Sequence, residues 1–296
     1  MIRSAGYTLA GLLIVLLLIG GAVFLRGRSQ AYATHAVEPR MGDLRVAAAR
    51  ADSARLARGN HLASIMGCRH CHGADLGGAV FADDPPLRLV ATNLTAGAGG
   101  MGRTYDAADW ARAIRHGVGP DGEPLLGMPS VSFHRLSDAD TEALVAYLQQ
   151  IEPVDRRLPP TTVKPLGALL IGVGQIDPAK NVVAGTDHPE HVPVAATAEH
   201  GAYLYGAACQ HCHGADLRGG PHPDPTGVAV PSLRGATTWS RAEFERATTQ
   251  GLSVDGDSLA DRWMPWSAFA SLSSTEMTAL YRYVRARASD VHASTP

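Results

Sequence analysis

The feature that most constrains the fold is a nine-residue stretch that occurs twice in the chain. CRHCHGADL occupies residues 68–76 and CQHCHGADL occupies residues 209–217, with eight of nine positions identical. The likeness continues downstream, where LGMPSVSFHRLSDADTEALVAYL at 126–148 matches RWMPWSAFASLSSTEMTALYRYV at 262–284. The distance between the copies falls from 141 to 136 residues, so the second copy is five residues shorter in its middle. Solenoid repeats have periods of roughly 20–50 residues, so this longer period predicts a tandem duplication of a whole domain.

Each copy carries the signals of helices. The stretches SRAE at 240–243 and SSTE at 273–276 are capping boxes, in which a serine and a glutamate three residues later bond the first amides of a helix. SDAD at 137–140 marks the start of the matching helix in the first copy. Apolar residues then recur at helical spacing, whereas the alternation of apolar and polar residues that indicates a strand is missing. We therefore predict an all-α fold, with domains at 53–152 and 198–296.

The two copies are joined by a segment, 153–197, that is rich in proline and glycine. This segment contains an apolar island, LGALLIGV, at 166–173. A membrane-spanning helix needs about 20 apolar residues, so the island is too short to cross a bilayer. We predict that it packs against one of the two domains.

The N-terminus contains an apolar run, because residues 5–25 carry no charge. As a helix this run would be about 31 Å long, which is close to the thickness of a bilayer core. A cleaved signal peptide is the alternative, with AYA at 31–33 as its cleavage site, but the apolar region of a signal peptide usually has about 7–15 residues. We predict a retained anchor over 1–28, followed by a polar tether over 29–52 that holds the first domain off the membrane.

All four cysteines lie within the repeated stretch, so none remains for a disulfide elsewhere. C-x-x-C-H is the attachment sequence of a c-type haem, in which two thiols form thioether bonds and the histidine binds the iron. The alternatives are a thioredoxin-like redox pair and a zinc site shared by the copies. A shared zinc site would not explain why each copy has its own helices and methionine. We therefore predict two covalent haem c groups, one held by Cys68, Cys71 and His72 and the other by Cys209, Cys212 and His213.

Two methionines occupy matching places among the seven in the chain. Met128 and Met264 align, and each precedes a proline and the last helix of its copy. The ordinary role of a methionine is core packing, but the match in both copies favours axial ligation of the iron. The predicted metal ligands are then His72 and Met128 in one site and His213 and Met264 in the other. Such a centre moves one electron and leaves no open position for a substrate.

The distal sides of the two predicted sites differ more than the proximal sides. Leu126 and Gly127 precede the first methionine, whereas Arg262 and Trp263 precede the second. We therefore predict two haems of one chemical type with two different reduction potentials.

Further residues of the first copy carry a family resemblance. Within 91–122, the sequence Asn93-Leu94-Thr95, the glycine-rich turn and the helix around Trp110, followed by GMP at 127–129, resemble cytochrome c subunits of membrane-bound alcohol, aldehyde and related dehydrogenases. The chain as a whole resembles a tandem di-haem class I c-type cytochrome. The resemblance implies two class I cytochrome c-like domains behind a single N-terminal transmembrane helix. Those subunits typically carry three haem domains and often a C-terminal anchor, whereas this chain has two copies and an N-terminal apolar run.

The motifs together predict a membrane-anchored di-haem cytochrome that passes single electrons and is not itself an enzyme. It would act as a carrier or as the electron-transfer subunit of a respiratory or dehydrogenase complex. The expected partners are a redox protein or a membrane dehydrogenase or oxidase complex, on the periplasmic face of a bacterial cytoplasmic membrane. The net charge of −2 provides no basic field for nucleic acid. The alternative is a di-haem peroxidase, which needs an iron with an open or displaceable distal position.

Overall fold

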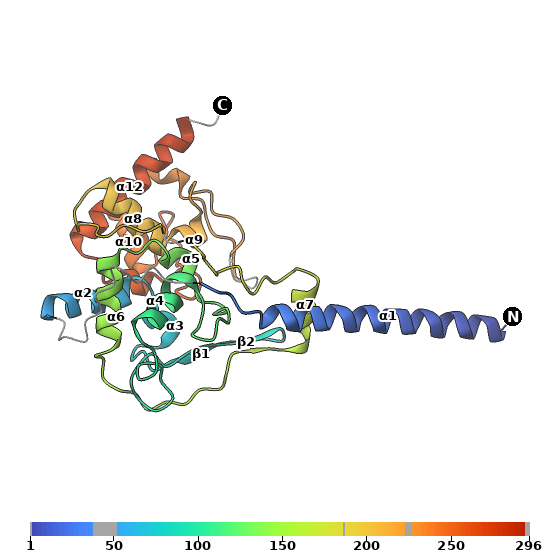
Figure 1. The fold of residues 1–296 in the computed structure, drawn as a ribbon. Coiled ribbons are helices and arrows are strands. Elements are labelled where there is room, and N and C mark those ends of the chain that lie inside the picture. The colour runs from blue at the N-terminus through green and yellow to red at the C-terminus, as the bar shows by residue number, and fades with distance from the viewer. Residues whose placement is uncertain (1, 38–51, 186, 223–226, 294–296) are drawn as a thin grey trace.

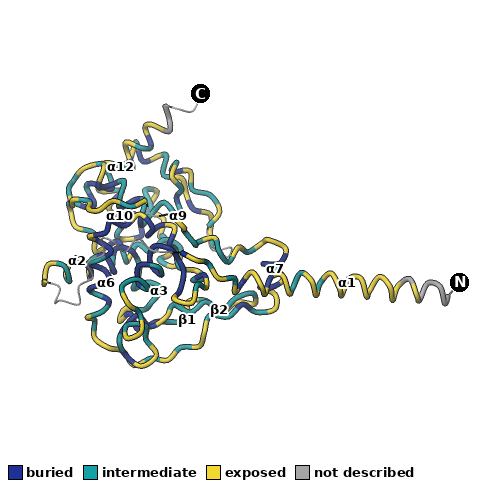
Figure 2. The backbone as a smooth tube through the Cα atoms, in the orientation of Figure 1, coloured by how far each residue is buried: buried dark blue, intermediate teal, exposed yellow. Residues whose placement is uncertain are grey.

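The computed structural model describes residues 2–37, 52–185, 187–222 and 227–293. One long helix projects from a globular body in which the two copies lie against each other (Figure 1). Buried residues of both copies form one continuous apolar core (Figure 2). The duplication therefore yields two domains that share an interface.

The projecting helix, α1, spans Ile2–Ala31. Its segment Leu9–Ala31 is long and apolar enough to cross a membrane, and most of its side chains are exposed. A signal sequence can have the same length and composition, so these two properties make the segment a candidate span without distinguishing it from a signal sequence. The predicted border between anchor and tether lies inside this helix, which continues to Ala31.

The predicted tether contacts the first domain where the structure describes it. Residues 38–51 of this tether lie outside the described residues. After the end of α1, the amide of His35 donates a hydrogen bond to the carbonyl of Gly122 at 2.8 Å. The start of the tether therefore runs along the first domain instead of leading freely away from it.

The two copies share their main helices, although the single helix α10 of the second copy corresponds to α4 and η1 of the first, and η2 occurs in the second copy alone among the described residues. The first helix of each copy, α2 (Ser53–Ile65) or α8 (Ala198–Ala208), packs across the last helix, α6 (Asp138–Leu148) or α12 (Ser274–Ala293). The shorter elements are α3 (Cys68–His72), α4 (Ala107–Ala111), the π-helix η1 (Arg112–His116) and α5 (Ser130–Phe133) in the first copy, and α9 (Gln210–His213), the 3-10 helix η2 (Arg234–Thr237), α10 (Arg241–Gln250) and α11 (Trp266–Phe269) in the second. The prediction of a mostly helical, duplicated fold is confirmed.

The predicted helix starts carry the expected caps. Ser240 and Glu243 form a complete capping box at the start of α10. At α12, the amide of Glu276 donates to the Ser273 hydroxyl at 3.2 Å, and the glutamate oxygen accepts from the serine amide at 2.9 Å. At α6, the Ser137 hydroxyl accepts from the amide of Asp140 at 3.1 Å, while the Ser137 amide donates to the hydroxyl of Tyr203. Side chains near in sequence therefore fix where these three helices begin.

The first copy also contains a small sheet, which the sequence analysis did not identify. Strands β1 (Ala79–Asp83), β2 (Leu87–Ala91) and β3 (Thr162–Val163) form an antiparallel sheet in the order β1-β2-β3. The register of β1 against β2 shifts between Val80 and Ala82, so the side chains do not alternate regularly there. Val80 and Phe81 are also 45% and 50% exposed. The strand therefore shows no alternation of apolar and polar residues in the sequence.

The apolar island of the linker forms helix α7 (Pro165–Gly172). This helix packs along the C-terminal part of α1, and Ala31, Val163, Ala168 and Ile171 form a small buried cluster between them. We predicted that the island would pack against one of the two domains. It contacts the first domain through the edge of this cluster, but its main neighbour is the N-terminal helix.

The first and last helices of each copy cross at a glycine. A Cβ atom at Gly59 would collide with the carbonyl oxygen of Ala143, and one at Gly201 would collide with that of Ala279. Each glycine also lies against the Cβ atom of a tyrosine on the last helix. The backbones therefore approach so closely that no side chain fits at either crossing.

We expect Gly59→Ala and Gly201→Ala each to destabilise the protein by about 1–3 kcal/mol, because overpacking forces the helices apart. Denaturant unfolding followed by circular dichroism measures the change. Gly206→Ala is the matched control in α8, since the nearest atom to its Cβ would be Gln210 Oε1 at 4.0 Å. This control should leave stability unchanged or raise it by up to about 1 kcal/mol. Equal effects in crossing and control positions would contradict the account of the crossing.

Candidate haem-binding sites

The repeated stretch folds to nearly the same backbone in both copies. The glycine after each motif histidine has a positive φ, 81° at Gly73 and 74° at Gly214. Three residues later, Leu76 and Leu217 also have positive φ values, 57° and 61°. Both leucines are buried, and a bulky residue at positive φ is uncommon. Its recurrence at equivalent places shows that the two copies repeat one local structure.

The motif histidines are oriented for metal binding. His72 Nδ1 lies 2.7 Å from the carbonyl oxygen of Thr92, and His213 Nδ1 lies 3.1 Å from that of Pro231. A carbonyl can only accept, so Nδ1 carries the proton and Nε2 is the nitrogen left to bind a metal. Burial lowers the pKa of both histidines, and the hydrogen bond to each carbonyl opposes this only in part. Both rings are therefore held neutral, as a metal ligand must be.

No disulfide links any two of the four cysteines, all of which lie in the described residues. Burial raises the pKa of Cys68 and of Cys209 to about 12, and that of Cys71 to about 11. A zinc site shared by the copies would need a cluster of such ligands, and among the described residues no group of three or more His, Cys, Asp or Glu side chains could hold a metal ion. The donor set, two thiols and one oriented imidazole in each copy, suits a covalently attached haem better than a shared zinc ion.

The two aligned methionines lie in the same local conformation. Pro129 has φ −82° and ψ 54°, and Pro265 has φ −75° and ψ 62°. The next amide returns to the methionine carbonyl, at 2.9 Å for Met128 and 2.7 Å for Met264. This is an inverse γ-turn, which fixes the direction of the chain after each methionine. The likeness of the copies therefore includes both methionine loops.

The surroundings of the two methionine loops differ. In the first copy, the Ser130 hydroxyl donates to the carbonyl of Ala113 in the π-helix at 3.0 Å. In the second, the indole of Trp266 donates to the carbonyl of Leu259 at 3.0 Å. Met101, which has no counterpart in the second copy, packs on the same apolar core as Met128. Different groups thus support the loops at matched positions.

The loop that orients His72 is held by Asn93. The side-chain oxygen of Asn93 accepts from the amide of Thr95 at 2.9 Å, and its amide nitrogen donates to the carbonyl of Val154 at 2.7 Å. Asn93 and Thr95 are buried. Thr92, whose carbonyl accepts the hydrogen bond from His72, immediately precedes Asn93. That carbonyl is therefore held in place by the bond from Asn93 to the segment that follows α6.

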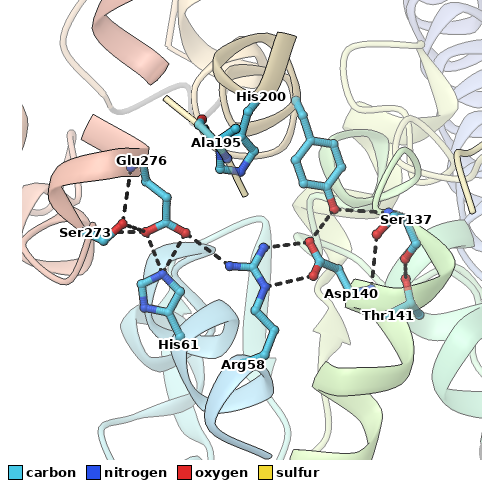
Figure 3. A network of polar contacts seen from close by, with 10 residues as sticks. Arg58, His61, Ser137, Asp140, Thr141, Ala195, His200, Ser273 and Glu276 are labelled. Atoms are coloured by element: carbon cyan, nitrogen blue, oxygen red, sulfur yellow. Dashed lines mark hydrogen bonds and ion pairs between the residues drawn. The ribbon is translucent and has the colours of Figure 1, made fainter. Parts of the chain in front are cut away.

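A polar network joins the two domains, and the sequence analysis did not identify it (Figure 3). Arg58 on α2 donates to both carboxylate oxygens of Asp140, at 2.9 and 2.8 Å, and to Glu276 at 3.1 Å. Asp140 lies in the first turn of the last helix of the first copy, and Glu276 lies in the first turn of the last helix of the second. One guanidinium therefore bridges equivalent acidic residues of the two copies.

The contacts around this bridge are reciprocal. His61 Nε2 lies 2.8 Å from a carboxylate oxygen of Glu276, and the hydroxyl of Tyr203 donates to Asp140 at 2.7 Å. His61 and Tyr203 each stand two residues after the crossing glycine of their helix, so their positions are equivalent. Each copy thus reaches from its first helix to the start of the other copy's last helix. This is the pattern of a two-fold interface.

Glu276 makes the interface sensitive to acid. Burial raises its pKa, but hydrogen bonds from His61 and Ser273 outweigh this effect and lower it to about 2 from 4.5. A carboxyl with a lowered pKa stabilises the folded state above its unfolded value and loses that contribution as pH falls from about 4.5 to about 2. We expect Glu276→Gln to reduce the loss of unfolding free energy over this window by about 3 kcal/mol.

Denaturant unfolding at a series of pH values measures this dependence. Glu245→Gln is the matched control, because Glu245 is exposed on α10 and contacts Arg241 at 3.8 Å. The control should keep the acid sensitivity of the parent chain. An unchanged pH profile in Glu276→Gln would contradict the assignment.

Comparison with known families assigns both domains. Residues 56–152 match the family model for cytochrome c, and residues 196–284 match the model for subunit III of cbb3-type cytochrome c oxidase. The chain therefore consists of two cytochrome c domains with one N-terminal apolar helix as a candidate membrane span. Both globular domains belong to the c-type cytochromes.

Several dehydrogenase subunits are similar to parts of the chain. The fructose dehydrogenase cytochrome subunit of Gluconobacter japonicus is 33% identical over 114 residues, which are 36% of this chain and 23% of that protein. The cytochrome c subunit of the quinone alcohol dehydrogenase of Gluconacetobacter polyoxogenes is 35% identical over 111 residues, 35% of this chain and 24% of that protein. A nicotinate dehydrogenase subunit of Pseudomonas putida is 29% identical over 266 residues, 78% of this chain and 21% of that protein. The chain spans less than a quarter of the length of each of these three relatives.

Proposed function

We propose that this chain is a membrane-anchored di-haem c-type cytochrome that passes single electrons as a carrier or as the electron-transfer subunit of a dehydrogenase complex. The observation that carries this proposal is the repeated pair of cysteines followed by a histidine whose Nδ1 is bonded to a backbone carbonyl in both copies. Similarity to cytochrome subunits of dehydrogenases supports the role of electron-transfer subunit.

The residues that would hold each haem follow from the donor set. Cys68 and Cys71 would form the thioether bonds of the first site, and His72 Nε2 and Met128 would be its axial ligands. The second site would use Cys209, Cys212, His213 and Met264. A haem with histidine and methionine ligands supplies a one-electron centre whose potential the thioether raises.

The chain's own residues prepare these sites. The carbonyls of Thr92 and Pro231 fix the tautomer and the direction of the two histidines. The inverse γ-turns at Pro129 and Pro265 restrict the methionine loops, so each ligand would be offered with little loss of backbone entropy. The contacts of Arg58 hold the two domains at a fixed separation, on which electron transfer between the sites would depend.

The proposed location follows from α1. Its uncharged run would cross the cytoplasmic membrane of a bacterium, with the haem domains on the periplasmic face. The partner would be a membrane dehydrogenase or another redox protein that meets these domains there. The similar proteins are named as subunits of fructose, nicotinate and alcohol dehydrogenases, which supports a dehydrogenase as the partner.

Intact mass spectrometry of the purified chain tests the cofactor and the anchor together. We expect two covalently bound haems and a mass that includes the N-terminal residues. Replacement of Cys68 and Cys71 by alanine should leave one haem, and the same change at Cys209 and Cys212 should leave the other. One haem or none in the parent chain would contradict the proposal, and a mass lacking residues 1–33 would contradict the anchor.

A further inference from the structure

Helix α7 and the end of α1 pack at very short range. A Cβ atom at Gly27 would collide with the carbonyl of Ala168, and one at Gly172 would collide with that of Val23. Ala168 and Ile171 are buried in this contact. Glycine and alanine at a helix crossing allow such an approach, which is typical of helices that associate in a membrane.

The contacts fix the direction of α7. Gly172 lies against Val23 and Ala168 against Gly27, while Val163, before the helix, shares a cluster with Ala31. The C-terminal end of α7 therefore lies further along α1, toward its projecting part, than the middle of α7 does. Figure 1 shows α7 beside the end of α1 that joins the globular body. The end of α7 thus lies level with Val23, which belongs to the uncharged run of α1.

The outer face of α7 is apolar and uncovered. Leu166, Leu169 and Val173 are 45%, 37% and 58% exposed, and they stand three or four residues apart on one side of the helix. The helix has no polar side chain. Leu25 of α1, at the same level, is 67% exposed, and it lies on the side of α1 turned away from α7 because Val23 and Gly27 make the contact. Leu166, Leu169 and Val173 therefore form an apolar surface beside the candidate span, and such surfaces mark contact sites.

Charged groups lie at the border of this surface. Lys164, just before α7, pairs with Asp83 at 2.6 Å. The guanidinium of Arg28 stands 5.1 Å from the centre of the Tyr32 ring, and aromatic and basic residues are the usual markers of a membrane interface. The polar ends of both helices therefore lie on the side of the domains, and the apolar end of α7 lies on the side of the span.

We propose that the C-terminal turn of α7 inserts into the interfacial zone of the lipid bilayer beside α1. This rests on the proposed function, because it requires α1 to be retained as an anchor. Leu126, two residues before Met128, packs on the cluster between α1 and α7. The first domain is then held against the membrane by two elements, with the loop of its candidate ligand next to them. This differs from a domain that hangs from a tether.

A depth-sensitive fluorophore tests the insertion in the full chain, reconstituted in phosphatidylcholine vesicles that carry a nitroxide quencher at the top of the acyl chains. The fluorophore is attached to a cysteine introduced by Leu169→Cys. Leu25→Cys reports on α1, and Val228→Cys, 60% exposed on the second domain, is the matched aqueous control. The haem-bound native cysteines do not react, which labelling of the parent chain verifies.

We expect quenching at position 169 within about two-fold of that at position 25, and little quenching at position 228. Quenching at 25 but not at 169 would overturn the insertion of α7 and leave the anchor intact. Loss of quenching at both positions would overturn the anchor, and the proposal with it.

Discussion

Met128→Ala and Met264→Ala will each remove the methionine–iron absorption band of one haem and leave that of the other. The loss of a thioether ligand destabilises the reduced iron. We therefore expect the potential of the altered site to fall by on the order of 0.1 V or more, within the roughly 0.8 V range that axial ligands set. Near-infrared absorption of the oxidised protein and a redox titration of each variant measure the two effects.

Met101→Ala is the matched control for the first site, because Met101 packs on the same apolar core as Met128. This control should keep both bands and both potentials. A band that survives Met128→Ala and disappears in Met101→Ala would move the ligand to the glycine-rich loop. No spectral change in either Met128→Ala or Met264→Ala would refute that methionine as a ligand.

The second large effect concerns the bridge between the domains. We expect Arg58→Ala to destabilise the folded chain by about 3–5 kcal/mol, because it leaves two acidic groups in the interface without their shared cation. Glu276 is 1% exposed and Arg58 is 21% exposed, so solvent cannot replace the guanidinium well. Calorimetry should show separate unfolding of the two domains in the variant, where the parent unfolds in one transition.

Arg55→Ala is the matched control on the same helix. Arg55 is 40% exposed and meets Glu142 at 3.9 Å, and an exposed pair of this kind contributes less than about 1 kcal/mol. Similar stabilities of Arg55→Ala and Arg58→Ala would contradict the bridging role. Arg58→Lys should recover part of the loss, since a lysine keeps the charge but cannot donate to both carboxylates in the same fork.

Much of the fold could be predicted from the sequence, because the relevant signals are local. The serines at the starts of α6, α10 and α12 bond amides three residues away. The repeat itself fixed the number of domains and the residues of the candidate sites. The sheet was missed because β1 is largely exposed and its register shifts, so the strand lacks alternation. The proline pair at 85–86 between β1 and β2 was a usable turn signal.

The interface between the domains could not be predicted in the same way. Periodicity shows which face of a helix is buried, but it does not show which neighbour covers that face. In the sequence, Arg58 and His61 look like surface residues of α2, because their partner Glu276 belongs to the second domain. The packing of α7 against α1 could not be predicted for the same reason. An apolar helix with small residues can pack equally well against a domain or against another helix.

The differences between the two sites lie outside the repeated stretch. The proximal backbones match through the positive φ values of Leu76 and Leu217. Ahead of the second methionine, the guanidinium of Arg262 stands 4.4 Å from the centre of the Trp263 ring. Leu126 occupies the place of Arg262 in the first copy and packs on the cluster near α1. One predicted site thus has a charged and aromatic loop, and the other has an apolar one.

A redox titration of the parent chain, with absorbed light and transferred charge recorded together, tests the central claim most directly. The account predicts two electrons per chain, taken up in two one-electron steps at different potentials. One electron per chain, or two electrons at a single potential, would contradict it.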